Sequence, residues 1–156
     1  MKFVTREKPK VDRVACPWLI SRFIDRGARF LFVEPDYVAD VAEELGAIAY
    51  DIKGAAFTHV GEACTFDTLI DAFDVTDPYV RELQPIVRGA DTARMDLAPE
   101  AAGLAAVSFG ISALSRGDDD EALRHGFTIY DALYAWRKFS AGETHNWPSA
   151  ARERAA

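Results

Sequence analysis

The first fifty residues alternate short runs of strand-forming residues with helical segments, and this alternation restricts the fold more than any other feature. Three runs are rich in β-branched and aromatic residues: 3–5, 29–33 and 48–50. Two segments between them repeat apolar residues at helical spacing and are followed by a glycine: 17–24 and 36–45. Such alternation favours a parallel sheet with right-handed crossovers. We therefore predict an α/β fold with a small, mainly parallel βαβαβ sheet of three to four strands, the fourth at residues 56–58.

The following part of the chain is predicted to be helical. Four segments carry the pattern: 66–73, 78–88, 99–115 and 119–139. Pro85 should kink or shorten the second of them, and Gly89 should end it. The third is apolar nearly all round, so we expect it to be buried at the centre of the fold. No linker interrupts the pattern, which predicts one domain over residues 1–140 followed by a polar tail over residues 141–156.

The charge of the chain limits its partners. Its net charge of −7 argues against binding nucleic acid, which needs a basic surface. Residues 1–30, however, hold eight Lys and Arg against three Asp and Glu. These charges could form a pocket for an anionic small molecule, or they could pair with the acidic remainder. No apolar run is long enough to cross a membrane, and residues 1–13 are too charged for a secretion signal. We therefore expect a cytoplasmic protein in which Cys16 and Cys64 are reduced.

The densest group of reactive side chains lies at the predicted start of the first helix, between Asp12 and Asp25. If Cys16 is the N-cap, the helix dipole and the free N–H groups favour its thiolate, which makes Cys16 the candidate catalytic residue. The same N–H groups with Arg13 would form a seat for an oxyanion, and Arg22 would join them if the chain folds back. The alternative is a buried packing cysteine, with Arg13 in an internal ion pair.

A second group lies in a glycine-containing loop, where His59, Glu62 and Cys64 fall within six residues. Imidazole, carboxylate and thiol are ligands for a transition metal such as Zn, Fe or Mn, and histidine also transfers protons near neutral pH. The spacing matches no established zinc motif, so at least one distant ligand is needed. The candidates for that ligand are Asp91, Asp131 and His145. The alternative is a structural histidine held by hydrogen bonds.

Two further stretches carry charged side chains that allow more than one interpretation. Arg88 and Asp91 flank the predicted helix end at Gly89. Arg88 could complete an anion site and Asp91 a metal site, or the two could tie that helix to its neighbours. In the last helix, Asp131 lies in a very apolar stretch, so it must be paired or must face a cavity if it is buried.

Several stretches together resemble one family. They are VTREKPKVDRVACPWLISRFID, FLFVEPD, HVGEACTFD, IVRGADT, DLAPEAAGL and YDALYAW, between Val4 and Trp136. In this order they are similar to the landmarks of the ChrB C-terminal domain family. The resemblance implies a link to chromate resistance, a stress response. It also marks eight motif positions: Arg13, Cys16, Arg22, His59, Glu62, Cys64, Arg88 and Asp91. Full-length members carry a preceding region implicated in chromate-responsive transcription, and because this chain starts at the C-terminal domain we do not expect it to bind DNA.

Three functions are compatible with these patterns. The leading hypothesis is a domain that binds or senses a small oxyanion such as chromate, with or without a metal ion, because arginines and helix N–H groups suit a tetrahedral dianion. The second is a metal-dependent redox or hydrolytic enzyme that uses His59 and Glu62. The third is a homodimeric interaction module that pairs through the apolar C-terminal helices. The first two require that the start of the first helix and the His59 loop line one open hollow.

Overall fold

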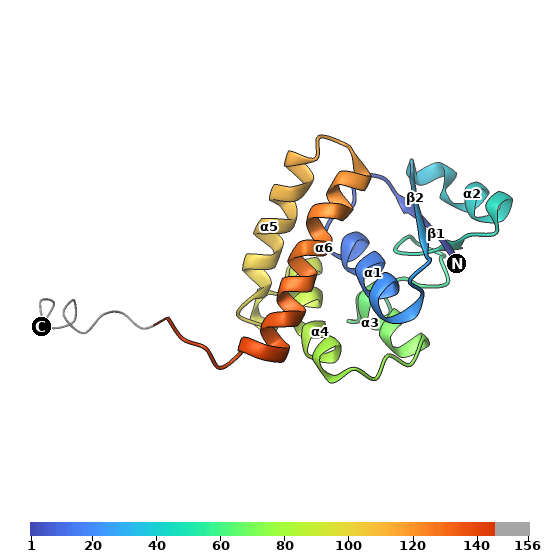
Figure 1. Cartoon of the computed structure of the whole chain (residues 1–156). Coiled ribbons are helices and arrows are strands. Elements are labelled where there is room, and N and C mark those ends of the chain that lie inside the picture. Colours follow the sequence, from blue (N-terminus) through green and yellow to red (C-terminus); the bar gives the residue numbers. More distant parts are fainter. Residues whose placement is uncertain (146–156) are drawn as a thin grey trace, which may run out of the picture.

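The computed structural model describes residues 1–145, in which a three-stranded parallel sheet is flanked by helices (Figure 1). The strands are β1 (Lys2–Arg6), β2 (Arg29–Val33) and β3 (Ile48–Ala49), in the order β2-β1-β3. Phe3 of the central strand pairs with Phe30 on one side and Ile48 on the other. The predicted α/β fold with a small parallel sheet is confirmed. The fourth strand expected at residues 56–58 is reduced to a single bridge at Phe57.

Helical crossovers connect the strands. The first consists of α1 (Asp12–Leu19) and the π-helical η1 (Ile20–Ile24), and the second of the short 3-10 helix η2 (Pro35–Tyr37) and α2 (Val38–Leu45). Gly46 ends α2 with a φ of 58°, a left-handed conformation that costs glycine little. These connections confirm the βαβαβ pattern.

The start of α1 differs from the prediction. The helix begins at Asp12, so Cys16 lies in its middle, and the prediction that Cys16 caps the helix is wrong. Proline is tolerated inside this helix for a structural reason. Pro17 leaves the carbonyl oxygen of Arg13 without its helical N–H donor, and this oxygen accepts the Tyr50 hydroxyl at 3.4 Å instead. A tertiary contact therefore outweighs the usual preference of proline for the first helical turn.

The helical C-terminal half is confirmed. Its elements are α3 (Thr65–Ala72), α4 (Pro78–Asp91), η3 (Met95–Leu97), α5 (Ala101–Leu114), α6 (Asp119–Ala135) and η4 (Trp136–Ser140). The prediction that α4 ends at Gly89 is wrong, because the helix continues through Pro85 and Gly89 to Asp91. Packing rather than a turn requires glycine at position 89, since a Cβ atom there would lie 2.8 Å from the Cβ atom of Ala101.

The core lies around α1, which is enclosed by elements from both halves of the chain. The ring centroid of the buried Trp18 lies 5.8 Å from that of Tyr130 in α6 and 6.5 Å from that of Phe66 in α3. Helix α6 approaches α1 closely at Gly126, where an added Cβ atom would overlap the Val14 side chain. The position of α1 therefore depends on α6 as much as on the sheet.

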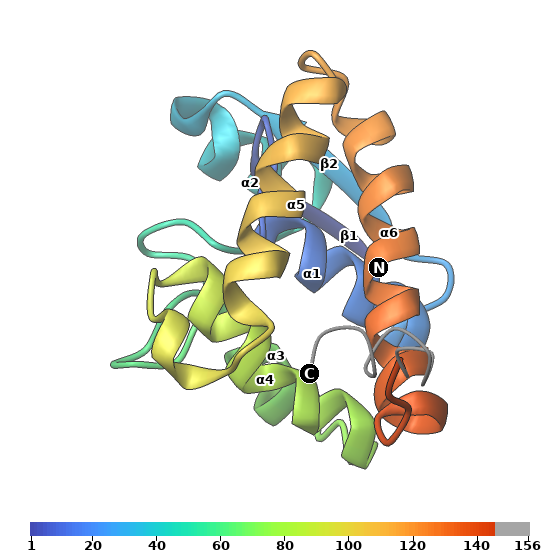
Figure 2. The same cartoon turned by 90° about the vertical axis from the view of Figure 1, so that its left-hand side faces the viewer.

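Helix α5 lies at the surface, and the prediction that it is buried at the centre is wrong. It runs beside α6 along one edge of the molecule and faces the viewer in Figure 2. Of its residues, Ala101, Leu104 and Ala105 are buried. Helices α4 and α6 cover one side of α5 and leave its other apolar side open. Within residues 1–145, no helix has the length and apolar character needed to span a membrane.

Candidate metal and anion pocket

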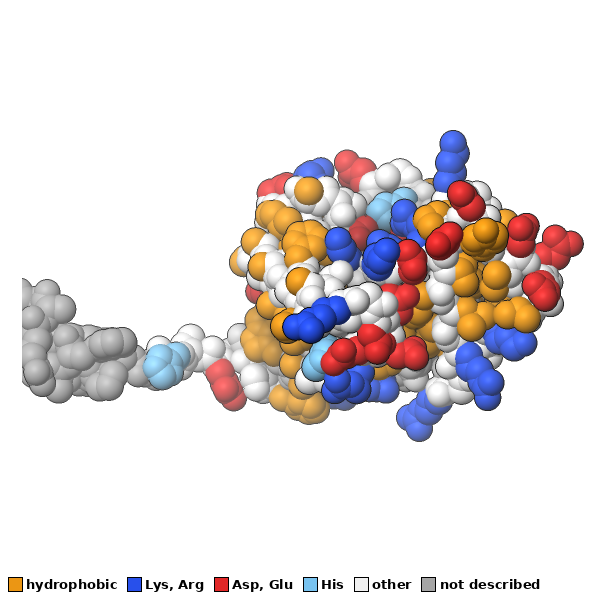
Figure 3. All heavy atoms as spheres, turned by 90° about the horizontal axis from the view of Figure 1, so that it is seen from above, with side chains coloured by type: hydrophobic (Ala, Val, Ile, Leu, Met, Phe, Trp, Pro, Cys, Tyr) orange, Lys and Arg blue, Asp and Glu red, His pale blue; other side chains and the backbone are white. Residues whose placement is uncertain are grey.

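An open pocket forms where the start of α1, the His59 loop and the end of α4 meet. Its volume is about 270 Å³, and it is lined by Arg6, Lys10, Val11, Arg13, Asp51, His59, Ala90, Asp91 and Phe109. Figure 3 shows a face of the molecule on which basic and acidic side chains lie close together. The start of the first helix and the His59 loop therefore do line one open hollow.

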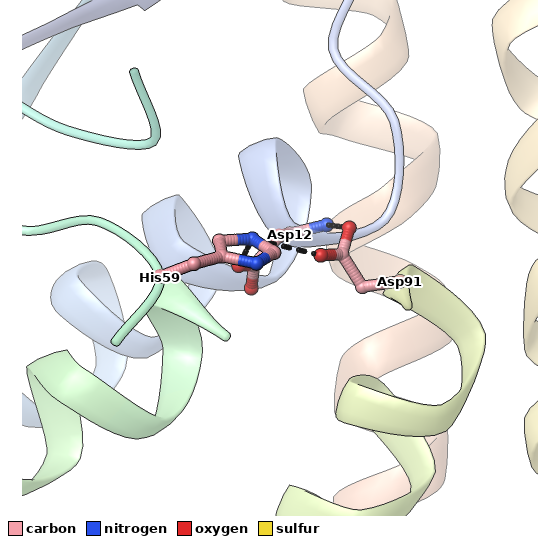
Figure 4. Close-up of side chains that lie close together, drawn as sticks. All are labelled: Asp12, His59 and Asp91. Carbon is pink, nitrogen blue, oxygen red and sulfur yellow. Dashed lines mark hydrogen bonds and ion pairs between the residues drawn. The ribbon is translucent and has the colours of Figure 1, made fainter. Parts of the chain in front are cut away.

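Three side chains from separate elements converge in this pocket (Figure 4). Nε2 of His59 lies 3.1 Å from Oδ2 of Asp91 and 3.6 Å from Oδ2 of Asp12. One ligand atom from each of the three residues lies within 4.8 Å of the others. A fourth group, Oδ1 of Asp51, is 3.5 Å from the same imidazole nitrogen. Carboxylates and imidazole at these separations can hold a divalent cation.

Asp12 is buried, and its carboxylate is fixed from several directions. Its two oxygens accept the backbone N–H groups of Thr65 at 2.6 Å and Phe66 at 3.0 Å, at the N-terminus of α3. The thiol of Cys16 donates to Oδ1 of Asp12 at 3.5 Å. A helix N-terminus favours negative charge, so Asp12 is held as an oriented acceptor beside His59. A metal ligand with such outer partners needs little reorganisation before it binds.

The backbone next to two pocket carboxylates is strained. Val11, which precedes Asp12, has a φ of 36°, and Asp51 has a φ of 50°. Positive φ is a genuine outlier for a β-branched residue such as valine. The carbonyl oxygen of Val11 accepts the hydroxyl of the buried Tyr130 at 3.1 Å. Such conformations persist only where the surroundings hold them, and they concentrate at functional sites.

The crowding of carboxylates shifts the titration of the pocket groups. The approach of the Asp12 carboxylate, with the charges of Asp91 and Asp51, raises the pKa of His59 to about 9, although burial opposes this shift. Burial, reinforced by Asp12 and Asp51, raises the pKa of Asp91 to about 7. The pKa of Asp51 is also raised, mainly by burial. In all three groups the charges of neighbouring carboxylates contribute to the shift, and a bound cation would offset that negative charge.

Basic side chains border the same pocket on one side, and we refer to Arg6, Lys10 and Arg13 as the basic edge. Arg13 donates to the carbonyl oxygens of Arg6 and Glu7 and lies 3.4 Å from Asp51. Arg6 donates to the Asp51 carboxylate at 3.2 Å, but its buried Nε has no partner within residues 1–145. The Lys10 ammonium lies 5.9 Å from the centre of the Phe109 ring. The pocket thus joins a carboxylate-rich side to the basic edge.

Comparison with known proteins places the chain among its relatives. The family described as ChrB, C-terminal domain, matches residues 3–137. The chain belongs to the ChrB C-terminal domain family. A curated relative, Protein ChrB of Cupriavidus metallidurans, is 37% identical over 136 residues, which are 85% of this chain and 40% of that protein. The chain therefore spans less than half the length of this relative. No solved structure matches.

The match to the ChrB family includes every residue that lines the pocket. Among the motif positions that the sequence marks, the structure brings Arg13, His59 and Asp91 together there. Arg22 lies elsewhere, in an exposed ion pair with Asp131 at 2.8 Å. Asp131 also accepts the indole N–H of Trp18, so it is paired rather than free to bind a metal.

The remaining motif positions of the ChrB domain are also not among the three converging residues Asp12, His59 and Asp91. Arg88 holds the buried Asp67 carboxylate at 2.8 Å and so ties α4 to α3. Glu62 is exposed and lines a separate pocket with Arg88, so it is not among the residues that line the His59 pocket. Cys64 is buried at the N-cap of α3, where its N–H donates to Asp67.

The geometry gives no support to Cys16 as a nucleophile. Cys16 has no exposed surface, and burial with the nearby charge of Asp12 raises the pKa of its thiol well above the ordinary value. A reactive cysteine needs an exposed, electropositive setting that favours the thiolate. The observed contact with Asp12 instead makes Cys16 a hydrogen-bond donor to a pocket carboxylate. His145, the third candidate for a distant ligand, is exposed beyond η4.

Four charged residues at the site are not among the predicted site residues: Arg6, Lys10 and Asp51, which line the pocket, and the buried Asp12, which faces His59. Asp12 was part of the densest cluster, but nothing in its spacing showed that its carboxylate would meet a helix start 53 residues away. The basic excess in residues 1–30 was the signal for Arg6 and Lys10. Asp51 directly follows the third strand, and ligand sites of parallel sheets gather at the carboxyl ends of strands.

Proposed function

We propose that this ChrB domain binds a divalent transition metal ion through Asp12, His59 and Asp91, and that the loaded pocket then binds an oxyanion such as chromate. The observation that carries the proposal is the convergence of three ligand atoms to within 4.8 Å in an open pocket. Two carboxylates and one imidazole suit Mn, Fe or Zn. Three protein ligands leave coordination positions free for an exchangeable group.

The charges in the pocket support binding of the metal before the anion. The carboxylates of Asp12, Asp51 and Asp91 face the same imidazole. Without a metal ion, their negative charge offsets the positive charge of the three side chains of the basic edge. A divalent cation would offset this negative charge and give the pocket a net attraction for an anion. We therefore expect oxyanion binding to require the metal.

The basic edge and the association of the ChrB family with chromate resistance support an oxyanion as the second ligand. A tetrahedral dianion could contact the metal ion with one oxygen and the guanidinium of Arg6 with another. The Nε–H of Arg6 lacks a partner within the described residues, so an acceptor there would satisfy a buried donor. Chromate and sulfate share this shape and charge. Equal affinities for the two anions would indicate general oxyanion binding, and a higher affinity for chromate would indicate selectivity.

The metal part of the proposal is tested by calorimetric titration of Mn²⁺ or Zn²⁺ into untagged protein that has been stripped with a chelator. Wild type should bind one ion per chain. His59→Ala should weaken binding by more than about 100-fold, since even the loss of an outer partner of a ligand costs roughly 10–100-fold. His125→Ala is the matched control, because the two imidazoles have nearly equal exposure, 42% and 43%. Wild type that binds no ion, or equal affinities in both variants, would contradict the proposal.

The anion part is tested by titrating chromate and sulfate into the protein with and without bound metal. Binding should be detected in the loaded protein and lost in the stripped protein. Arg6→Gln should weaken it about tenfold or more, because a charge-assisted hydrogen bond is removed. Arg22→Gln serves as the control, since Arg22 pairs with Asp131 outside the pocket. Equal binding by loaded and stripped protein would show that the metal has no role.

A further inference from the structure

The outer side of α5 is an apolar surface without a partner in the described chain. No charged residue occurs between Ala101 and Leu114, although the chain carries a net charge of −7. Three large side chains on this side are exposed: Val107 by 44%, Phe109 by 54% and Leu114 by 74%. Isolated exposed apolar residues are common on proteins, but an uncharged helix side of this length marks an interaction surface.

Small residues run along the middle of this side, and internal packing does not explain them. An added Cβ atom on Gly103 or Gly110 would meet nothing within 4 Å, whereas at Gly89 it would clash with Ala101 and at Gly126 with Val14. Glycine inside a helix lowers stability relative to alanine. Glycines that no contact within the chain requires therefore point to a contact with another molecule. Gly103 and Gly110 are two turns apart and exposed, and so are Ala106 and Ala113 on the same side. We refer to these four small residues as the seam. A seam of this kind lets a second helix approach closely.

The pattern of small and large residues is nearly symmetric about Ser108. Three pairs of exposed residues at equal distances from it match in size, namely Gly103 with Ala113, Ala106 with Gly110, and Val107 with Phe109, whereas Ala102 and Leu114 do not. In a twofold contact, residue i meets residue j of the other copy while j meets i. Two antiparallel copies of α5 would therefore place seam against seam and bulky flank against bulky flank. A parallel pair would also place small residues against small ones, because each residue would then meet its own copy, so the size pattern alone does not set the orientation.

The charges at the two ends of α5 favour the antiparallel arrangement. Glu100 precedes the helix and Arg116 follows it, and neither has an ion-pair partner within residues 1–145. The nearby Asp118 and Asp119 already accept backbone N–H groups of Glu121 and Lys8. An antiparallel pair brings Glu100 of each copy to Arg116 of the other. A parallel pair would place like charges together.

We propose that a second copy of this chain docks on the outer side of α5, in an antiparallel contact about a twofold axis beside Ser108. A helix of 14 residues is about 21 Å long, so the buried area falls at the small end of protein interfaces. The dimer is therefore weak and depends on concentration. Phe109 also lines the metal pocket, so the partner lies next to the pocket mouth. This proposal rests on α5 and its ends alone, without the proposed metal or anion binding as a premise.

Sedimentation equilibrium of the full chain across a range of concentrations tests the contact. Wild type should form a monomer–dimer equilibrium. Leu114→Glu should raise the dissociation constant about 100-fold, because a charge is buried in each half of the contact. Phe139→Glu is the matched control, because both side chains are 74% exposed and Phe139 lies in η4, away from the seam. Wild type that stays monomeric, or a dimer that resists Leu114→Glu, would overturn the proposal.

Charge exchange tests the antiparallel orientation. Glu100→Arg and Arg116→Glu should each weaken the dimer by about threefold to tenfold, since each places two like-charged pairs at the ends. The double variant restores opposite charges and should return the dissociation constant to that of wild type. A double variant as weak as the single ones would refute the antiparallel pairing. Circular dichroism of all variants checks that the fold is kept.

Discussion

At the scale of single residues, Asp12 connects the fold to the pocket. Its carboxylate accepts the first N–H groups of α3 and the thiol of Cys16 while facing His59. The same oxygen atoms therefore serve the stability of the domain and the proposed binding of metal. Substitution at Asp12 should affect both properties, whereas substitution at His59 should affect mainly the second.

We predict that Asp12→Asn destabilises the metal-free domain and abolishes metal binding. The amide that replaces one oxygen is a donor facing N–H donors, and the loss of these charge-assisted bonds costs about 2–3 kcal/mol. Urea denaturation and calorimetric titration measure the two effects. Asp131→Asn is the control, because this exposed carboxylate contacts Arg22 and should change stability by less than about 1 kcal/mol without altering metal affinity. Wild-type metal affinity in Asp12→Asn would remove Asp12 from the ligand set.

We also predict that the metal-free domain loses stability as pH rises. The pKa of His59 is raised from 6.5 to about 9 in the folded chain, so its contribution is fully present below pH 6.5 and lost by about pH 9. Allowing for solvent screening, the loss is about 1 kcal/mol. Asp91, raised to about 7 by burial, changes stability in the same direction at lower pH.

Urea denaturation of stripped protein between pH 6.5 and 9 measures this decline. His59→Gln should flatten it, because the amide does not titrate. Stability that increases over this interval in wild type would show that His59 is not held near carboxylates.

Part of the pocket was predictable at this scale. His59 and Asp91 are recognisable in the sequence as candidate metal ligands, because imidazole and carboxylate are common ligand groups. Asp12 and Asp51 are not, because their role depends on contacts across the fold: Asp12 with Thr65, and Asp51 with Arg6. Local sequence shows which side chains can bind a metal, but not which of them meet.

At the scale of elements, α6 stabilises the loop between β1 and α1, which carries Lys10 and leads into Asp12. Asp119 at the start of α6 accepts the N–H of Lys8, and Tyr130 further along donates to the carbonyl oxygen of Val11. The strained loop is therefore fixed near both ends by one helix. Changes in α6 should reach the pocket without touching any ligand.

We predict that Tyr130→Phe weakens metal binding about tenfold, because the Val11 carbonyl loses its donor and Asp12 its fixed position. Tyr134→Phe is the control one helical turn away, since its hydroxyl donates to Asp77 outside the pocket. Both variants should lose about 1 kcal/mol of stability, as expected for one hydrogen bond. Metal titration measures the effect on the position of Asp12, and urea denaturation measures the effect on stability. Equal metal affinities in the two variants would limit Tyr130 to a structural role.

The two classes of glycine predict opposite effects of alanine. Gly126→Ala should destabilise the monomer by about 1–3 kcal/mol, because the new Cβ atom overlaps Val14 at the α1–α6 contact. Gly103→Ala should stabilise the monomer by up to about 1 kcal/mol, because it meets open space within a helix. Urea denaturation at low protein concentration measures both. The same sign for both variants would contradict the described packing.

Most elements were predictable, and the exceptions have physical causes. Periodicity indicated three strands and the C-terminal helices correctly, whereas the fourth strand expected at residues 56–58 is a single bridge. The helix boundaries predicted from Pro17 and Gly89 are wrong. The Tyr50 hydroxyl donates to the carbonyl oxygen that Pro17 leaves without a donor, and close packing on Ala101 requires glycine at position 89. Proline and glycine therefore act here through tertiary contacts rather than as local stop signals.

At the scale of the whole molecule, the proposed metal site connects three distant parts of the chain. Asp12 follows the first strand, His59 lies in the loop after the third, and Asp91 ends α4. A ligand that bridges them binds only the folded chain and must stabilise it. The helical half was predicted correctly as a class, but its arrangement was not, because apolar composition alone does not distinguish a buried helix from one with an open side.

We predict that metal raises the melting temperature of the domain. At a free ion concentration of about 100 times the Kd, the gain is about 2.7 kcal/mol, which corresponds to roughly 5–10 °C for a chain of this size. Calorimetry with and without Mn²⁺ or Zn²⁺ measures the shift, and a chelator should reverse it. His59→Ala should show no shift. A metal-induced decrease in wild type would indicate binding to the unfolded chain instead.

Phe109 belongs to two surfaces at once, the wall of the pocket and the flank of the α5 seam. If both proposed sites exist, they share this ring, which gives a physical route for one to affect the other. Suppose that a ligand in the pocket moves Phe109 and so changes the affinity between two copies by some factor. Linkage then requires that dimerisation change the affinity of the pocket for that ligand by the same factor. Self-association would then set how sensitive the domain is to its ligand, so its response would follow its own abundance in the cell.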